Sequence, residues 1–195
     1  MGPEPAAGGA IAMAGTPTQL PPPVAGQTVN AALRSGRVRY RLPGASAFVA
    51  LTDPVQVPLG TTFDTTAGRV TLLSASNDQG ATQHAWFYEG TFTVDQTQSD
   101  HPITTLTLAG AKPICTKARA VTKRRTRHLW GDGKGRFRTS GRFSSATVRG
   151  TRWVVIDRCD GTLTRVVRGV VAVRDFRRHT TVLVRAGHEY LARAR

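Results

Sequence analysis

Residues 152–175 read RWVVIDRCDGTLTRVVRGVVAVRD. β-branched residues dominate this segment and alternate with polar ones, which is the pattern of half-buried β-strands. Asp160-Gly161 lies between two such runs and is a strong signal for a hairpin turn. The segment therefore predicts strands at 152–158, 163–167 and 170–176, joined by tight turns.

The same pattern extends outward along the chain. Val38, Tyr40 and Leu42 alternate with arginines, and Pro43-Gly44 marks a turn after them. Turn signals also occur at 65–68 and 77–80, and residues 54–60 have the composition of a loop. We expect further strands at 37–42, 48–51, 69–76, 81–88, 91–96, 103–108, 136–143, 146–149, 180–185 and 189–192. The sequence thus predicts an all-β fold, a sandwich or roll of roughly a dozen short antiparallel strands.

The first 23 residues differ in composition from the rest. They are rich in Pro, Gly and Ala and contain no Lys or Arg, which is typical of a disordered linker. They lack the basic start and the long apolar stretch of a signal peptide, so we expect any export signal to be absent from this chain. No apolar run reaches the roughly 18 residues that would span a membrane. We expect a linker at 1–23 and a single β domain at 24–195.

The net charge of +15 is unevenly distributed. Residues 1–110 hold five Arg and seven acidic residues, a net charge of −2, whereas residues 111–195 carry +17. Such asymmetry indicates an anionic partner for the second half, such as nucleic acid, an anionic envelope polymer or lipid headgroups. The alternative is that the arginines only solvate exposed strand faces.

Cys115 and Cys159 are the only cysteines, and they bracket the Gly-, Arg- and aromatic-rich segment 129–143. In an exported protein they would form a disulfide, and in a cytosolic protein they would be two buried thiols. No further Cys or His lies at metal-ligand spacing from either. We favour the disulfide, because a cross-link would stabilise a segment that has little apolar core.

The basic run at 123–128, followed by Trp130, is the best candidate for a binding site. Arginine side chains bind phosphate and carboxylate oxygens, and an adjacent aromatic ring can stack on a base or a sugar. The anion-binding candidates are Lys123, Arg124, Arg125, Arg127, Trp130, Arg136, Arg138 and Arg142. The alternative is again the solvated face of half-buried strands. For 116–127 a short helix and a loop are both compatible with the sequence.

The spacing of Gly131, Gly133 and Gly135 is that of a nucleotide-binding loop, but the residues and the helix that should follow such a loop are missing. A phosphate loop needs Gly-Lys followed by Ser or Thr at the start of a helix, and a calcium loop needs several oxygen ligands where this segment has Asp132 alone. We therefore expect a Gly-rich loop with positive φ angles. The five histidines, and Ser144 and Ser145, show no catalytic or metal-binding spacing, so we expect no enzyme, no cofactor and no metal.

Two carboxylates flank the second cysteine. Asp157 and Asp160 are three residues apart near the predicted turn, a spacing at which ion pairs with nearby arginines are more common than catalysis. We expect them to cap the turn or to pair with Arg158 and Arg165.

Two stretches resemble a FecR-like domain. The first is Gly36-x-Val38 followed by Leu51, PLGTTFDT at 58–65 and GRVTL at 68–72, and the second is GVVAVR at 169–174 followed by VRAG at 184–187. Both begin with a Gly-led strand, and this internal similarity predicts two related hairpins that pack together. From Pro21 onward the chain also resembles uncharacterised exported domains of GC-rich Gram-positive bacteria.

The resemblance implies an extracytoplasmic β domain used in binding or signal relay at the envelope, without catalysis. The chain departs from the sigma-factor regulators of that family, since it shows no transmembrane helix and no cytoplasmic anti-sigma segment. We therefore expect a secreted or envelope-associated binding or scaffold domain. Its partner would be an anionic envelope polymer or another envelope protein. The alternative is a nucleic-acid-binding protein that uses residues 117–142.

Overall fold

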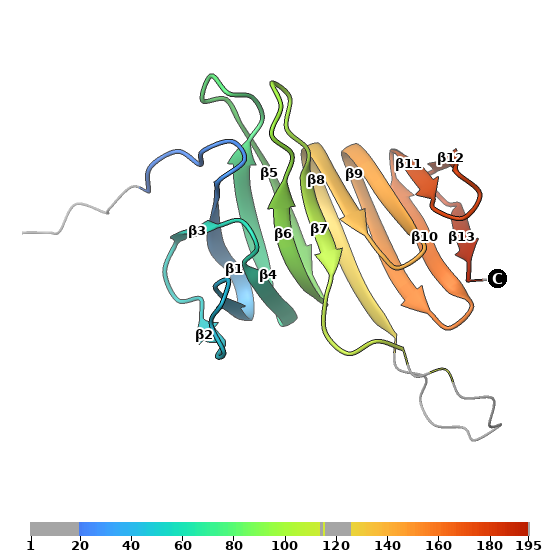
Figure 1. The fold of residues 1–195 in the computed structure, drawn as a ribbon, viewed down its shortest axis with the longest axis horizontal. Helices are drawn as coiled ribbons and strands as arrows, with labels where there is room; N and C mark the ends of the chain where they lie inside the picture. Colours follow the sequence, from blue (N-terminus) through green and yellow to red (C-terminus); the bar gives the residue numbers. More distant parts are fainter. Residues whose placement is uncertain (1–19, 114, 116–125, 195) are drawn as a thin grey trace, which may run out of the picture.

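The computed structural model describes residues 20–113, 115 and 126–194. The prediction of an all-β fold is confirmed: the described residues form thirteen strands (Figure 1). The strands are β1 Thr28–Arg41, β2 Val49–Ala50, β3 Val55–Pro58, β4 Thr62–Ala75, β5 Thr82–Tyr88, β6 Thr91–Gln96, β7 Thr104–Leu108, β8 Arg127–Ser140, β9 Ser144–Arg158, β10 Gly161–Arg168, β11 Val170–Asp175, β12 Thr180–Arg185 and β13 Glu189–Arg193. Within this described part no helix is long and apolar enough to cross a membrane.

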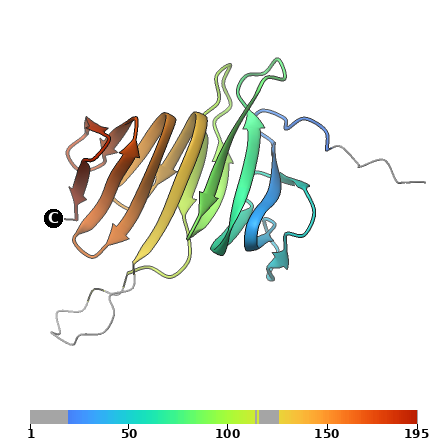
Figure 2. The same cartoon turned by 180° about the vertical axis from the view of Figure 1, so that it is seen from behind.

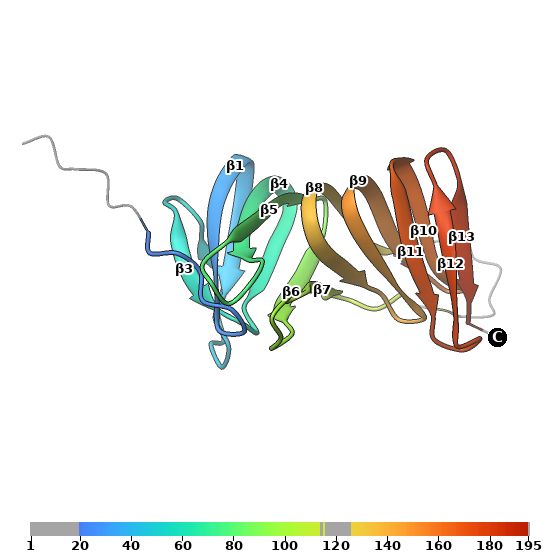
Figure 3. The same ribbon diagram turned by 90° about the horizontal axis from the view of Figure 1, so that it is seen from above.

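The strands form two layers that share four long members. The first layer has the pairing order β3-β1-β4-β5-β8-β9-β10-β13, and the second has the order β2-β1-β4-β6-β7-β8-β9-β11-β12. Seen from above, β5 lies on one side and β6 and β7 on the other, and β8 runs between the two sides (Figure 3). The fold therefore combines the facing layers of a sandwich with the continuous strands of a roll.

Each shared strand pairs with different neighbours in its two halves. The first half of β8 pairs with β5 at Tyr88↔Trp130, and its second half pairs with β7 at Thr104↔Phe137. Irregularities in the pairing fall between the halves, for example between Gly133 and Arg136 in the β8–β9 ladder. Such bulges bend a strand and increase its twist, which lets one strand serve both layers.

Aromatic side chains fill the space between the layers. Phe87 of the first layer packs 5.6 Å from Phe92 and 5.7 Å from Phe137, which both belong to the second, measured between ring centroids. Trp153 meets Phe87 edge to face, and its indole N–H donates to Thr139 Oγ1 at 3.1 Å. All four rings are fully buried, so the two layers enclose one continuous core.

The Gly-rich segment lies inside β8, so the expectation of a Gly-rich loop there was wrong. At Gly131 an added Cβ would lie 2.4 Å from a carbon of the Trp153 indole. At Gly133 it would lie 2.4 Å from the Cβ of Ala85 on the neighbouring strand. Of the three glycines in this segment, only Gly135 has a positive φ, 124°. The first two glycines therefore make room for the core, and the third forms a bulge.

Several local predictions were wrong because turn-forming residues occur inside strands. Residues 65–68 were expected to turn the chain but continue β4, and residues 54–60 were expected to be a loop but contain β3. Among the described residues β3 pairs only with β1, and an edge strand tolerates proline because one side of its backbone needs no partner. The pairing of β7 with β8 is parallel, in contrast to the expected antiparallel arrangement.

The hairpin predicted at Asp160-Gly161 is confirmed, but its turn residues are Cys159 and Asp160, and Gly161 begins β10. The Asn77–Gly80 turn is also confirmed. In the second, the Asn77 side chain accepts from the backbone N–H groups of Gln79 and Ala81. The two Gly-led hairpins do not pack together as expected. β1 and β11 belong to opposite ends of the pairing order, and the colours of Figures 1 and 2 pass in chain order along the long axis.

The described fold begins at Leu20, within the segment expected to be a linker. Asn30 Nδ2 donates to Pro21 O at 2.9 Å, and Gln56 Nε2 lies within 3.2 Å of the carbonyls of both Pro21 and Pro22. Pro23 is buried. Residues 20–23 thus pack on β1 and β3, while residues 1–19 of the expected linker lie outside the described part.

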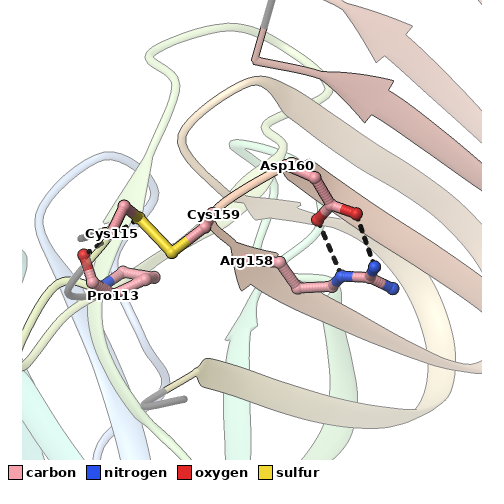
Figure 4. The surroundings of a disulfide bond; sticks show 5 residues. All are labelled: Pro113, Cys115, Arg158, Cys159 and Asp160. Carbon is pink, nitrogen blue, oxygen red and sulfur yellow. Dashed lines mark hydrogen bonds and ion pairs between the residues drawn. A yellow bond between two sulfur atoms is a disulfide. The ribbon is translucent and has the colours of Figure 1, made fainter. Parts of the chain in front are cut away.

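The predicted disulfide is confirmed. Cys115 and Cys159 are bonded, with 5.4 Å between their Cα atoms and a separation of 44 positions in sequence (Figure 4). Cys115 Sγ lies 3.5 Å from Pro113 O, a contact rather than a hydrogen bond because a disulfide sulfur has no proton to donate. The bond joins the segment after β7 to the turn between β9 and β10.

Candidate functional site

The sequence-predicted binding residues lie in several places. Lys123, Arg124 and Arg125 lie outside the described residues, as does most of the predicted helix or loop at 116–127. Arg127 is half-buried and directs its guanidinium to Asp157, with Nη2 2.7 Å from Oδ2. This arginine neutralises an internal carboxylate, so it contributes little to an external anion site.

The remaining candidates lie on different surfaces. Arg142 lies beside Phe143, with its guanidinium 5.1 Å from the ring centroid. Arg138 is on the second layer, where its Nε donates to Thr147 Oγ1 at 3.2 Å. Trp130 is on the outer side of the first layer, opposite Tyr88. The described candidates therefore do not form one patch, and each contacts a different set of neighbours.

Asp157 and Asp160 form ion pairs, as expected, but only one of them with an expected partner. Asp160 binds Arg158 through two hydrogen bonds, of which one joins Nε and Oδ1 at 2.8 Å (Figure 4). Asp157 pairs with Arg127, because its side chain points into the core while Arg158 points outward. Arg165 pairs with Glu189 across β10 and β13.

A row of aromatic and arginine side chains crosses the outer side of the first layer. Arg69 of β4, Tyr88 of β5 and Trp130 of β8 are opposite one another in the strand register. The rings of Tyr88 and Trp130 stack with 5.9 Å between centroids and 5° between planes. The Arg69 guanidinium lies 4.3 Å from the Tyr88 centroid. Alternation explains this placement, because Phe87 and Leu129 on the same strands point into the core.

A second row runs beside the first, two residues further along each strand. Trp86 is opposite Asp132, which is opposite Arg152. Arg34 covers the Trp86 ring at 3.7 Å, and Arg168 Nη2 lies 2.8 Å from Asp132 Oδ1. Arg152 connects the rows, since its Nη2 donates to Tyr88 Oη at 3.1 Å. We call these two rows the aromatic–arginine face: Arg34, Arg69, Trp86, Tyr88, Trp130, Asp132, Arg152 and Arg168.

The aromatic–arginine face is cationic and pre-ordered. It carries four arginines and one carboxylate, and Arg34, Arg69 and Arg168 are exposed while Trp86 and Trp130 are half-buried. Arginine over an aromatic ring gains a cation–π attraction and keeps its hydrogen-bond donors free at the ring edge. Such a surface can bind a polymer with regularly spaced anionic groups while sugar rings or bases contact the indoles.

Most of this face was not predicted from the sequence. Of its eight members only Trp130 was a candidate, because it follows a basic run. The alternation of Trp86 and Tyr88 with core residues was visible as a strand signal. Of their partners, Arg69 lies on the preceding strand, whereas Arg34 and Arg152 lie on strands distant in sequence. Their convergence depends on strand order and register, which no local pattern supplies.

No protein-family model, curated protein or solved structure matches this chain. The resemblance to FecR-like domains therefore stays a prediction. Within residues 20–113, 115 and 126–194, no three His, Cys, Asp or Glu side chains come together in a way that could hold a metal ion.

Proposed function

We propose that this protein is a non-catalytic, extracytoplasmic binding domain that holds an anionic polymer of the cell envelope on its aromatic–arginine face. The observation that carries the proposal is the pair of aligned rows in which Arg34, Arg69 and Arg152 lie against the rings of Trp86, Tyr88 and Trp130. An extended, repetitive ligand suits such a surface, because its residues lie on six strands, β1, β4, β5, β8, β9 and β10.

The disulfide supports the compartment in this proposal. Cys115–Cys159 is a bond that persists in oxidising surroundings and is rare in the cytosol. The same bond favours an envelope polymer over nucleic acid as the partner. Nucleic acid remains the second candidate on one observation, since half-exposed indoles flanked by arginine also suit single-stranded DNA or RNA.

The test compares two triple variants that remove the same charge. The face variant is Arg34→Gln/Arg69→Gln/Arg168→Gln. The control variant is Arg177→Gln/Arg178→Gln/Arg185→Gln. It changes three exposed arginines, of which the first two follow β11 and the third lies in β12. Both are titrated at two salt concentrations with poly(glycerol phosphate) and with single-stranded oligo-dT. Tryptophan emission reports contact, because Trp86 and Trp130 are accessible while Trp153 is fully buried.

We expect the face variant to bind the polymer at least about tenfold more weakly than the control, with affinity falling steeply with salt through counterion release. Equal weakening of both variants would show a general charge effect and overturn the proposal. A loss of oligo-dT binding alone, with polymer binding unchanged, would replace the envelope polymer by nucleic acid as the partner.

A further inference from the structure

A basic hollow lies at one end of the sandwich, beyond the aromatic–arginine face. It occupies about 520 Å³ between β5, β8 and the loops that follow β4 and β6. These two loops rise side by side at the top of Figures 1 and 2. The cationic or titratable side chains that line it are His84, His101, Lys134 and Arg136, and Ser76 and Asn77 add polar groups.

The buried side chain of Gln83 holds the backbone of Arg136 in place. Gln83 is almost fully buried, and its Oε1 accepts from the Arg136 backbone N–H at 2.6 Å. Its Nε2 reaches Thr104 Oγ1 and Ser74 Oγ at 3.3 and 3.4 Å. These hydrogen bonds of Gln83 hold the bulge at Gly135, whose φ of 124° only glycine adopts readily. Bulges of this kind re-aim the side chain that follows them, here Arg136.

No carboxylate neutralises the hollow. His84 is directly opposite Lys134 in the β5–β8 register, so two basic residues are cross-strand neighbours. The ion pairs of the described residues include none of the four basic side chains, and no acidic residue lines the hollow. Asp78 and Asp100 lie in the two loops, and Asp132, two residues before Lys134, pairs with Arg168; none of these three carboxylates is in the lining. Like charges placed opposite one another cost stability, so an anion would relieve the repulsion between Lys134 and a protonated His84.

We propose that this hollow is an oxyanion site that binds one phosphate or sulfate group. A tetrahedral oxyanion presents oxygens in several directions, which suits donors that converge from two strands and two loops. Lys134 and Arg136 supply permanent charge, and His84 and His101 add charge when protonated. The site does not depend on the aromatic–arginine face, although a polymer bound there could place a terminal phosphate in it.

The first experiment titrates the full chain with sulfate and follows the side-chain NMR signals of His84 and His101. Sulfate keeps both negative charges across the range in which histidines gain their proton, about pH 5 to 8. We expect saturable shifts of both imidazoles, and tighter binding at the acidic end of this range. No saturable shift, or equal affinity at both ends of the range, would overturn the proposal.

The second experiment uses Lys134→Gln/Arg136→Gln, with Arg138→Gln/Arg142→Gln as a control of equal charge change on the same chain segment. We expect the first variant to bind sulfate at least about tenfold more weakly and the control to bind like the parent protein. Equal loss in both would show only a general charge effect and overturn the site. Thermal melting verifies that both variants are folded.

A comparison of glycerol phosphate with a sulfated monosaccharide then separates the two sources of the oxyanion, and the tighter ligand identifies the group. Failure here is distinguishable from failure of the proposed function. Sulfate binding tests the hollow alone, whereas the face variant retains every residue of the hollow.

Discussion

Arg127 and Asp157 form an ion pair at the edge of the core, with the Asp157 side chain 1% exposed and the Arg127 side chain 15% exposed. The second carboxylate oxygen accepts from Thr162 Oγ1 at 2.6 Å and from the Arg142 backbone N–H at 2.9 Å. The carboxylate therefore connects β8, β10 and the turn between β8 and β9. A buried charge with this many partners is costly to orphan.

We predict that Asp157→Asn lowers the free energy of unfolding by about 3 kcal/mol, because it leaves the Arg127 guanidinium without its counter-charge. Denaturant melts measure the change. The matched control is Arg158→Gln, which breaks the exposed Arg158–Asp160 pair and should change stability by less than about 1 kcal/mol. Similar losses in the two variants would contradict a special role for the buried pair.

Gly131 is predicted to be intolerant of any side chain. Gly131→Ala would place a methyl group against the Trp153 indole and should cost about 1–3 kcal/mol through overpacking. A double-mutant cycle with Trp153→Phe tests the mechanism, since the alanine should cost less when the larger ring is gone. Additive losses would show that the strain arises elsewhere.

Removal of the disulfide should destabilise the protein without changing its fold. For a loop of this length, the chain-entropy model gives a loss of about 4 kcal/mol for Cys115→Ser/Cys159→Ser, less any strain present in the native bond. Thermal melts of the variant and of the reduced parent protein should agree. An unchanged melting temperature in both samples would contradict the prediction.

Asp175 should make stability depend on pH in the acidic range. Burial alone would raise the pKa of its carboxyl. Hydrogen bonds from the Arg178 backbone N–H, the Tyr190 hydroxyl and the Arg177 backbone N–H outweigh burial and, with the Arg178 charge, hold the pKa below its ordinary value of 3.8.

A lowered folded-state pKa stabilises the protein above the ordinary value, and this contribution is lost as the pH falls through the folded-state pKa. We therefore expect Asp175→Asn to melt below the parent protein at about pH 7 and the difference to shrink as the pH falls below the ordinary value of 3.8. A difference that stays constant with pH would show that the carboxylate charge is not responsible.

Two N-terminal deletions should differ. Removal of residues 1–19 eliminates none of the described contacts and should leave the melting temperature within a few degrees. Removal of residues 1–23 also takes away the carbonyls of Pro21 and Pro22 that accept from Asn30 and Gln56, as well as the buried Pro23. We expect the longer deletion to lower the melting temperature further, and equal effects would show that residues 20–23 contribute nothing.

The sequence predicted strands best where alternation and turn residues agreed. Residues 91–96 were assigned correctly at both ends, and Asp160-Gly161 marked its hairpin. Of the four long strands, β9 was predicted in two pieces, and only part of β1, β4 and β8 was predicted as a strand. In β4 and β8 the reason is that Gly68 and Gly135 look like turns in the sequence. In the structure Gly68 lies against the backbone of Arg37, where an added Cβ would lie 2.6 Å from the carbonyl oxygen. Glycine occurs both in turns and where two strands approach closely, so the residue type alone does not distinguish the two.

The candidate site was predicted less well than the fold. Trp130 was found from its neighbours in sequence, whereas Arg34 and Trp86, 52 positions apart, meet only through the pairing of β1 with β4 and of β4 with β5. Gln83, beneath the basic hollow, gave no signal at all, because a buried glutamine is recognised only from its partners. In both cases the pairing of strands that are distant in sequence determines which side chains meet.

The disulfide also determines how the protein responds to a protease. Lys117, Arg119, Lys123, Arg124 and Arg125 lie between Cys115 and the start of β8, and each is a cleavage residue for trypsin. A single cut among them would separate β1–β7 from β8–β13 in the covalent backbone, yet Cys115 and Cys159 would still join the two pieces. The cleaved protein would migrate as one species until a reductant is added, and its two halves would remain paired through β5–β8 and β7–β8.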